Sequence, residues 1–179
     1  INKFDPNHIK NLDLRIGLIF RNYSSKTDEK LIIKIRDYCR INKRKFFLSN
    51  DLRLAIKLGL DGAYLPSFNK DFFGRKFQLK QKFMIMGSAH NLKEIYLKNK
   101  QGCTKILFSK LFLVDYDQKA PFLGINKFNK YYNYISQRLV PLGGIKISNL
   151  NLLKDLGSDA VAIYSAIKKK PAKIINRLF

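Results

Sequence analysis

One short pattern occurs twice in this chain and restricts the folds open to it. Residues 57–65 read KLGLDGAYL and residues 155–163 read DLGSDAVAI, and in both a helix ends at a glycine, a small polar turn follows and an apolar strand comes next. Residues 102–108 form a looser third copy. Regular alternation of helices and strands is typical of a parallel sheet in an α/β protein. Seven or eight such units favour one (β/α)8 TIM barrel domain over residues 1–179, rather than a doubly wound open sheet.

Apolar runs predict the strands, and amphipathic patterns predict the helices between them. The expected strands are residues 14–20, 46–48, 63–65, 83–86, 105–108, 140–142 and 160–163. The expected helices are residues 28–40, 51–58, 91–100, 126–137, 149–156 and 171–178. Because the chain opens on Ile1 rather than Met, residues 1–4 are expected to be the remnant of a truncated first strand.

The composition limits the class of protein. A chain of 179 residues with 46% hydrophobic residues suits one domain with a sizeable core. No apolar run is long enough to span a bilayer and no leader pattern is visible, so we expect a cytoplasmic protein with no membrane partner. Cys39 and Cys103 lie far apart and outside any metal-binding spacing, which predicts two packing cysteines with neither zinc nor a disulfide.

The formal net charge of +22 raises the question of nucleic acid. The lysines are scattered through every expected helix, however, and only residues 168–170 form a basic run. This distribution indicates a solvated basic surface that favours anionic substrates. Nucleic acid is therefore not expected as a partner, and the oligomeric state stays open, a homo-oligomer included.

Residues 140–148, VPLGGIKIS, combine a short strand, two glycines and a helix start. Glycines allow close backbone approach, and the main-chain N–H groups of such a turn can bind an anion. A structural turn without a ligand is the alternative, because short glycine motifs are common. The next strand leads into Tyr164 and Ser165, and phosphate sites of barrels are often built after strands seven and eight, so we expect a phosphate here.

Polar residues recur directly after the predicted strands, where a barrel gathers them on one rim. They are Arg21, Asn22, Asn50, Asp51, Ser88, His90, Lys110, Gly143, Gly144 and Ser165. Arginine and glycine turns suit phosphate oxygens, while Asn50 and Asp51 supply the oxygen ligands that Mg²⁺ prefers. Each residue also has a structural alternative: Asn50 and Asp51 form a common helix N-cap pair, and Arg21 could pair with Asp51.

Several motifs together resemble the thiamine phosphate synthase and thiazole tautomerase family, in order and at fitting spacings over residues 14–167. They are Asn50-Asp51, GLDGAYL at 59–65, GSAH at 87–90, GGI at 143–145 and DAVAIYSAI at 159–167. The resemblance implies the barrel fold and a Mg²⁺-dependent transferase. That enzyme joins hydroxymethylpyrimidine diphosphate to a thiazole phosphate and releases pyrophosphate, so its substrates are small phosphorylated compounds.

The resemblance also implies roles for single residues. Arg21 and Asn50 would contact the diphosphate, Asp51 would hold Mg²⁺ and Ser88 would touch a leaving-group oxygen. The thiazole phosphate would be bound by the residues Gly143, Gly144, Tyr164 and Ser165. Lys119 would replace the lysine of the family's loop after the sixth strand.

This chain departs from the family pattern at three places. Tyr23 stands where the family has a lysine, Asn69 where it has a second metal aspartate, and residues 114–117, ending at Asp117, where it has a Thr-x-Thr-Lys run. The tautomerase branch uses a histidine where this chain has Lys110. A thiazole tautomerase and a non-catalytic phosphate-binding relative are therefore the alternatives to the synthase.

Overall fold

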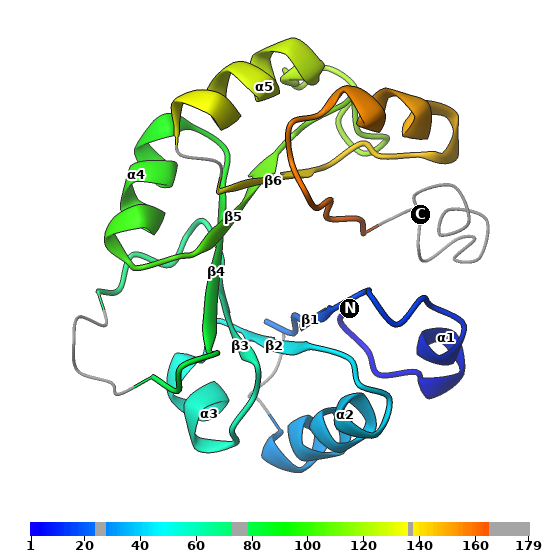
Figure 1. The fold of residues 1–179 in the computed structure, drawn as a ribbon, viewed down its shortest axis with the longest axis vertical. Coiled ribbons are helices and arrows are strands. Elements are labelled where there is room, and N and C mark those ends of the chain that lie inside the picture. Colours follow the sequence, from blue (N-terminus) through cyan, green and yellow to red (C-terminus); the bar gives the residue numbers. More distant parts are fainter. Residues whose placement is uncertain (24–27, 73–78, 136–137, 165–179) are drawn as a thin grey trace.

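The computed structural model describes residues 1–23, 28–72, 79–135 and 138–164, which form a curled parallel sheet with helices on its outer side (Figure 1). The elements in chain order are α1 (Pro6–Lys10), β1 (Leu18–Phe20), α2 (Glu29–Ile41), β2 (Phe46–Ser49), α3 (Leu52–Lys57), β3 (Gly62–Leu65), β4 (Met84–Ala89), α4 (Leu92–Lys100), β5 (Lys105–Ser109), α5 (Gly124–Tyr134), β6 (Leu139–Leu142) and the 3-10 helix η2 (Ile147–Asp155).

The sheet has six strands in the order β1-β2-β3-β4-β5-β6, and every neighbouring pair is parallel. Each strand therefore lies beside the next one along the chain, with a helix packed outside most connections (Figure 1). All four residues of β2 and all four of β3 are buried, as expected for strands covered on both faces. The predicted α/β class and the parallel sheet are confirmed.

Isolated pairings continue the sheet at both edges. Beside β1, the Ile1 nitrogen donates to the Ile19 carbonyl and the Arg21 N–H donates to the Ile1 carbonyl, both at 2.7 Å. Beside β6, Ala162 forms a parallel bridge with Leu142. The strands expected at residues 1–4 and 160–163 are thus reduced to these pairings, and the described residues form six of the eight expected strands.

Strand β4 corrects the predicted strand end at residue 86, because it continues to Ala89 and pairs with β5 as far as Phe108. The glycine that suggested a turn, Gly87, has a packing reason instead. A Cβ at Gly87 would lie 2.8 Å from Lys98 Cδ and 2.9 Å from Cys103 Sγ. The glycine lets α4 approach the sheet, and Ser88 consequently lies inside a strand.

Other predicted boundaries also need correction. Strand β1 begins only at Leu18, because Asp13 and Arg15 form a turn in which the Asp13 carboxylate accepts from the Arg15 backbone at 2.8 Å. The helix expected at residues 149–156 is η2, a 3-10 helix that starts at Ile147. The helix expected at residues 171–178 lies outside the described residues.

A buried lysine ties α4 to the loop after β3. Lys98 is fully buried, and its ammonium donates to the carbonyls of Pro66 (2.7 Å) and Asn69 (2.8 Å) and to Gln101 Oε1 (2.8 Å). Burial lowers the pKa of Lys98 from its ordinary value. Three oxygen acceptors therefore take the place of a carboxylate partner in fixing this loop.

The packing role predicted for the cysteines is confirmed, since Cys39 and Cys103 are buried as free thiols. Among the described residues, no helix combines the length and the apolar character needed to cross a bilayer.

Candidate functional site

A cavity of about 990 Å³ opens at the carboxyl ends of the strands. Five of the six strands place a residue in its lining, either from their last positions or from the residue that follows them. These residues are Arg21, Tyr64, Ser88, Ser109 and Leu142. Parallel strands thus bring together side chains that are far apart in the sequence, as the sequence predicted for Arg21 and Ser88.

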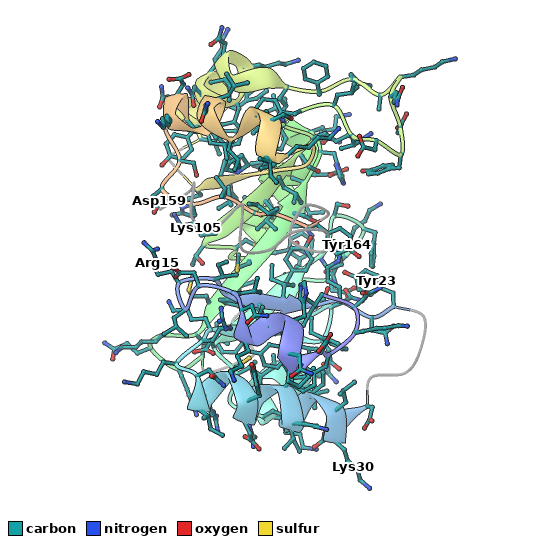
Figure 2. All side chains as sticks on the ribbon, turned by 90° about the vertical axis from the view of Figure 1, so that its right-hand side faces the viewer. Arg15, Tyr23, Lys30, Lys105, Asp159 and Tyr164 are labelled. Carbon is teal, nitrogen blue, oxygen red and sulfur yellow. The ribbon has the colours of Figure 1, made fainter. Side chains whose placement is uncertain are left out.

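The two ends of the sheet are distinct in Figure 2. Arg15, Lys105 and Asp159, which precede or begin strand segments, lie at one end, whereas Tyr23 and Tyr164, which follow them, lie at the other. Tyr164 lines the cavity and is 43% exposed, so it stands at the mouth.

Arg21 follows β1 and contacts two aromatic rings. Its guanidinium carbon lies 5.5 Å from the ring centroid of Tyr23 and 5.8 Å from that of Tyr64. Among the described acidic residues, none forms an ion pair with Arg21, so the predicted alternative of an Arg21–Asp51 pair is not formed. The arginine therefore presents a positive charge to the cavity.

Two buried serines line the cavity. Ser88 neighbours the Tyr64 hydroxyl, and burial raises the pKa of Tyr64. Ser109 is also buried, and its Oγ lies 2.9 Å from His90 Nδ1. The backbone of His90 is fixed in turn, because its N–H donates to Glu94 Oε2 at 2.7 Å. A histidine next to a buried serine gives the cavity a group that can transfer a proton.

The glycine turn, Gly143 and Gly144, forms another wall. Both residues have positive φ, 98° and 69°. A Cβ at Gly144 would lie 2.4 Å from the Phe112 carbonyl oxygen, so only glycine fits there. The Gly144 amide donates no hydrogen bond to another described residue, whereas the Gly143 amide lies in the parallel bridge that joins Leu142 to Ala162. An amide of this kind beside a cation suits an anion.

The loop between β5 and α5, residues 110–123, carries two ion pairs beside the glycine turn. Lys110 Nζ lies 3.0 Å from Asp117 Oδ2, and Lys146 pairs with Asp115. Both lysines line the cavity. Asp115 and Asp117 of this loop therefore neutralise the two lysines that line the cavity.

The predicted metal residues lie outside this lining. Asp51 caps α3, where its Oδ1 accepts from the Leu54 N–H at 2.9 Å, as the N-cap alternative predicted. Asn50 has φ 63°, and its Oδ1 accepts from Asn69 Nδ2 at 2.9 Å. Carboxylate and amide oxygens therefore gather after β2, next to the loop that follows β3.

Asn69 is buried and has no capacity left for a metal ion. Its side-chain oxygen accepts from Gln101 Nε2 (3.0 Å) and the Asp71 N–H (3.1 Å), and its amide nitrogen donates to Asn50. The carboxylate on this loop belongs to Asp71, whose Oδ2 lies 3.3 Å from Asn69 Nδ2. The sequence analysis missed Asp71, because it assigned the family's second metal position to Asn69, two residues earlier in the chain.

The remaining predicted residues are placed as follows. Lys119 is exposed and does not line the cavity. Ser165 lies outside the described residues. Tyr64, Ser109 and Lys146 line the cavity, although the sequence did not single them out. The first two are buried strand residues that sequence patterns assign to the core, and Lys146 is one of many lysines in a basic chain.

Comparison with known proteins gives two similar relatives of comparable length. The thiamine-phosphate synthase of Fusobacterium nucleatum is 25% identical over 147 residues, which cover 82% of this chain and 71% of the relative. The thiamine-phosphate synthase of Thermoplasma acidophilum is 26% identical over 162 residues, which cover 85% and 72% of the two chains.

Solved structures share the fold. Thiamine phosphate pyrophosphorylase from Pyrococcus furiosus superimposes with a TM-score of 0.70 at 17% identity, covering 97% of this chain and 86% of that one. A 4-hydroxy-2-oxoglutarate aldolase superimposes with a TM-score of 0.55 at 13% identity. Since the same fold occurs in an aldolase, the structural similarity shows the fold alone.

The family comparison is more specific, because it follows the sequence motifs described above. Residues 12–167 match the thiamine monophosphate synthase family. This range includes the arginine after β1, the Asn50-Asp51 pair and the glycine turn. The chain belongs to the thiamine monophosphate synthase family.

Proposed function

We propose that this protein is a thiamine phosphate synthase, which joins hydroxymethylpyrimidine diphosphate to thiazole phosphate and releases pyrophosphate. One observation carries the proposal: Arg21, Ser88 and the glycine turn line the same cavity, together with Lys110 and Lys146. Family membership and the relatives' activity support it. Because both substrates are charged phosphate esters, which cross membranes poorly, we also propose that the protein acts in the cytoplasm.

The proposed reaction demands charge stabilisation more than acid–base chemistry. The bond between the pyrimidine methylene carbon and the diphosphate oxygen breaks, and the thiazole nitrogen forms a new bond to that carbon. Arg21 and Ser88 would bind the departing pyrophosphate, since a guanidinium and a hydroxyl can both donate to its oxygens. The turn of Gly143 and Gly144 would bind the thiazole phosphate, chiefly through the Gly144 amide, and hold its ring in line.

Mg²⁺ is part of the proposal. Asp51 supports this part of the proposal, because one of its carboxylate oxygens has no hydrogen-bond partner among the described residues, and Asp71, linked to Asn50 through Asn69, is exposed. The described residues contain no cluster of three or more acidic, histidine or cysteine side chains that could hold a metal ion, so phosphate and water would supply the other ligands. Asp51 would hold the ion, and Asp71 would supply the second carboxylate that Asn69 does not. Bound there, Mg²⁺ would neutralise charge on the diphosphate.

We further propose that the complete fold is the closed (β/α)8 barrel. The six strands would occupy positions two to seven, with the Ile1 segment as strand one and the Ala162 segment as strand eight. The parallel hydrogen bonds of Ile1 beside β1 and the bridge of Ala162 beside β6 support this assignment.

The test is a synthesis assay with both substrates and Mg²⁺, which we expect to yield thiamine phosphate. Asp51→Asn is the informative variant, because asparagine preserves the cap of α3 but lacks the carboxylate charge. We expect it to lower the rate at least about a hundredfold. Asp37→Asn, an exposed aspartate on α2, is the matched control. Failure of the folded wild-type protein to form product would contradict the synthase.

A second function is favoured by the His90–Ser109 pair. A thiazole tautomerase needs a group that moves a proton. Lys110 forms an ion pair with Asp117, whereas His90 lines the cavity and forms a hydrogen bond with Ser109. Incubation with the thiazole tautomer alone distinguishes the two functions. Isomerisation that is lost in His90→Gln, without synthesis by the wild-type protein, would replace the first proposal by the second.

A further inference from the structure

The three cations of the cavity are held in two different ways. Lys110 and Lys146 are each paired with an aspartate of the β5–α5 loop, and Lys110 also lies 5.6 Å from the ring centroid of Tyr116. Arg21 instead contacts the rings of Tyr23 and Tyr64, and no described carboxylate pairs with it. A carboxylate would fix the guanidinium by using its N–H donors and neutralising its charge, whereas an aromatic face attracts the cation and leaves the donors at its edge free.

Both tyrosines are themselves anchored. The Tyr23 hydroxyl lies 2.6 Å from Ser49 Oγ at the end of β2, and the Tyr23 ring meets Phe68 edge-on at a centroid distance of 5.4 Å. Tyr64 is 2% exposed, so its ring is held by burial within β3. Tyr23 is 46% exposed, and its contacts with Ser49 and Phe68 hold its ring beside Arg21.

The backbone of Arg21 is also fixed, since its N–H donates to the Ile1 carbonyl at 2.7 Å. With its main chain held at the sheet edge and its head group held by two rings, the long side chain loses little further freedom when it binds an anion. Prior ordering of this kind lowers the cost of binding.

We propose that Tyr23 and Tyr64 are positioning residues, which hold the Arg21 guanidinium on the anion with all its donors available. Tyr23 thereby has a role of its own at the position where the family has a lysine. The inference rests on the proposed function for the identity of the anion, a diphosphate, but the contacts themselves do not depend on it.

The first measurement is the binding of inorganic pyrophosphate by calorimetry, which needs no turnover. We expect Tyr23→Leu to weaken binding about three- to tenfold, because one cation–π contact is lost. Tyr23→Phe keeps the ring and removes only the bond to Ser49, so it should lose at most about twofold, and Ser49→Ala should match it. Tyr96→Leu is the control, since Tyr96 makes a similar cation–π contact with Lys100 on α4, outside the cavity lining.

A double-mutant cycle then shows whether Tyr23 acts through Arg21. We expect Arg21→Met to weaken binding more than Tyr23→Leu does, and the double variant to be no weaker than Arg21→Met alone. If Tyr23→Leu costs the same factor in both backgrounds, Tyr23 contacts the anion directly and the inference is overturned. Equal binding by Tyr23→Leu and the wild-type protein would overturn it as well.

The synthesis assay separates this inference from the proposed function. Coupling between Tyr23 and Arg21 in pyrophosphate binding, without any synthesis, would leave the positioning role in place and remove the synthase. In an active protein, we expect Tyr23→Leu to lower kcat/KM by the factor by which it weakens pyrophosphate binding, and Tyr23→Phe to restore most of the loss. Absence of pyrophosphate binding by the wild-type protein would overturn the inference.

Discussion

The ammonium of Lys110 lies 3.0 Å from the Asp117 carboxylate, so a cation that lines the cavity is neutralised by its own loop. An anion that enters beside the glycine turn competes with Asp117 for this lysine. Asp117→Asn should therefore tighten pyrophosphate binding by about two- to fivefold at low salt, the scale of an exposed ion pair. Calorimetry at two salt concentrations checks this, because the gain should shrink as salt rises.

The control for that change is Glu29→Gln. Glu29 pairs with Lys57 at 2.9 Å on the outer surface, so its substitution alters net charge equally without touching the cavity. An equal gain in both variants would show that net charge, and not the loop pair, limits binding.

Two glycines with positive φ give a matched comparison. Gly102 has φ 80° with nothing within 4 Å of an added Cβ, whereas a Cβ at Gly144 would collide with the Phe112 carbonyl. Gly102→Ala should lower the free energy of unfolding by about 1–2 kcal/mol through backbone strain alone. Gly144→Ala should cost more and also weaken pyrophosphate binding. Urea unfolding measures the loss of stability, and calorimetry measures pyrophosphate binding. Equal losses of stability in the two variants would mean that the β5–α5 loop moves away from a Cβ at residue 144 without a cost in free energy.

Lys98 predicts a dependence of stability on alkaline pH. Because burial lowers its pKa below the ordinary 10.5, the unfolded chain binds more protons than the folded one between these two values. The contribution of Lys98 to the free energy of unfolding therefore rises with pH across that interval. The difference in unfolding free energy between the wild-type protein and Lys98→Met should grow accordingly.

The measurement is urea unfolding at a series of pH values approaching 10.5. Lys93→Met, which removes an exposed lysine of the same helix, should give a difference that stays constant. A difference for Lys98→Met that stays constant or falls with pH would contradict the assignment.

Both thiols should be unreactive in the native protein. Burial raises the pKa of Cys39 to about 11 and that of Cys103 to about 12, and the thiolate is the reactive form. Ellman's reagent at about pH 8 should therefore detect almost no thiol until concentrated guanidinium unfolds the chain. Rapid reaction of one thiol in the folded protein would show that the packing around it opens.

Much of the fold followed from local patterns. The ends of β2, β3 and β5 were predicted within one residue, since apolar runs flanked by polar turns leave little choice. The predicted end of β4 was wrong for a non-local reason. Gly87 leaves room for the side chain of Lys98, which lies on the following helix. The 3-10 geometry of η2 also escaped prediction, because an apolar period cannot distinguish the two helix types over so few residues.

The site was predicted in part for the same reason. Arg21, Ser88 and the glycine turn follow from the rule that strand ends share one rim. The contact of Tyr23 with Arg21 could not be predicted, because it depends on how the segment after β1 lies against β2 and β3. The fixed position of Asn69 likewise depends on Gln101, which is distant in sequence.

The close contact of Gly144 with Phe112 also bears on how this chain can change in evolution. The Leu111 N–H donates to the Leu142 carbonyl at 2.9 Å, and the Phe112 N–H donates to the Gly143 carbonyl at 3.1 Å. These hydrogen bonds fix the position of the first loop residues relative to the glycine turn. Insertions or deletions there would displace one wall of the cavity. Changes of length are tolerated better among the exposed residues 115–119, and lineages of this chain should differ in loop length at that point and not before it.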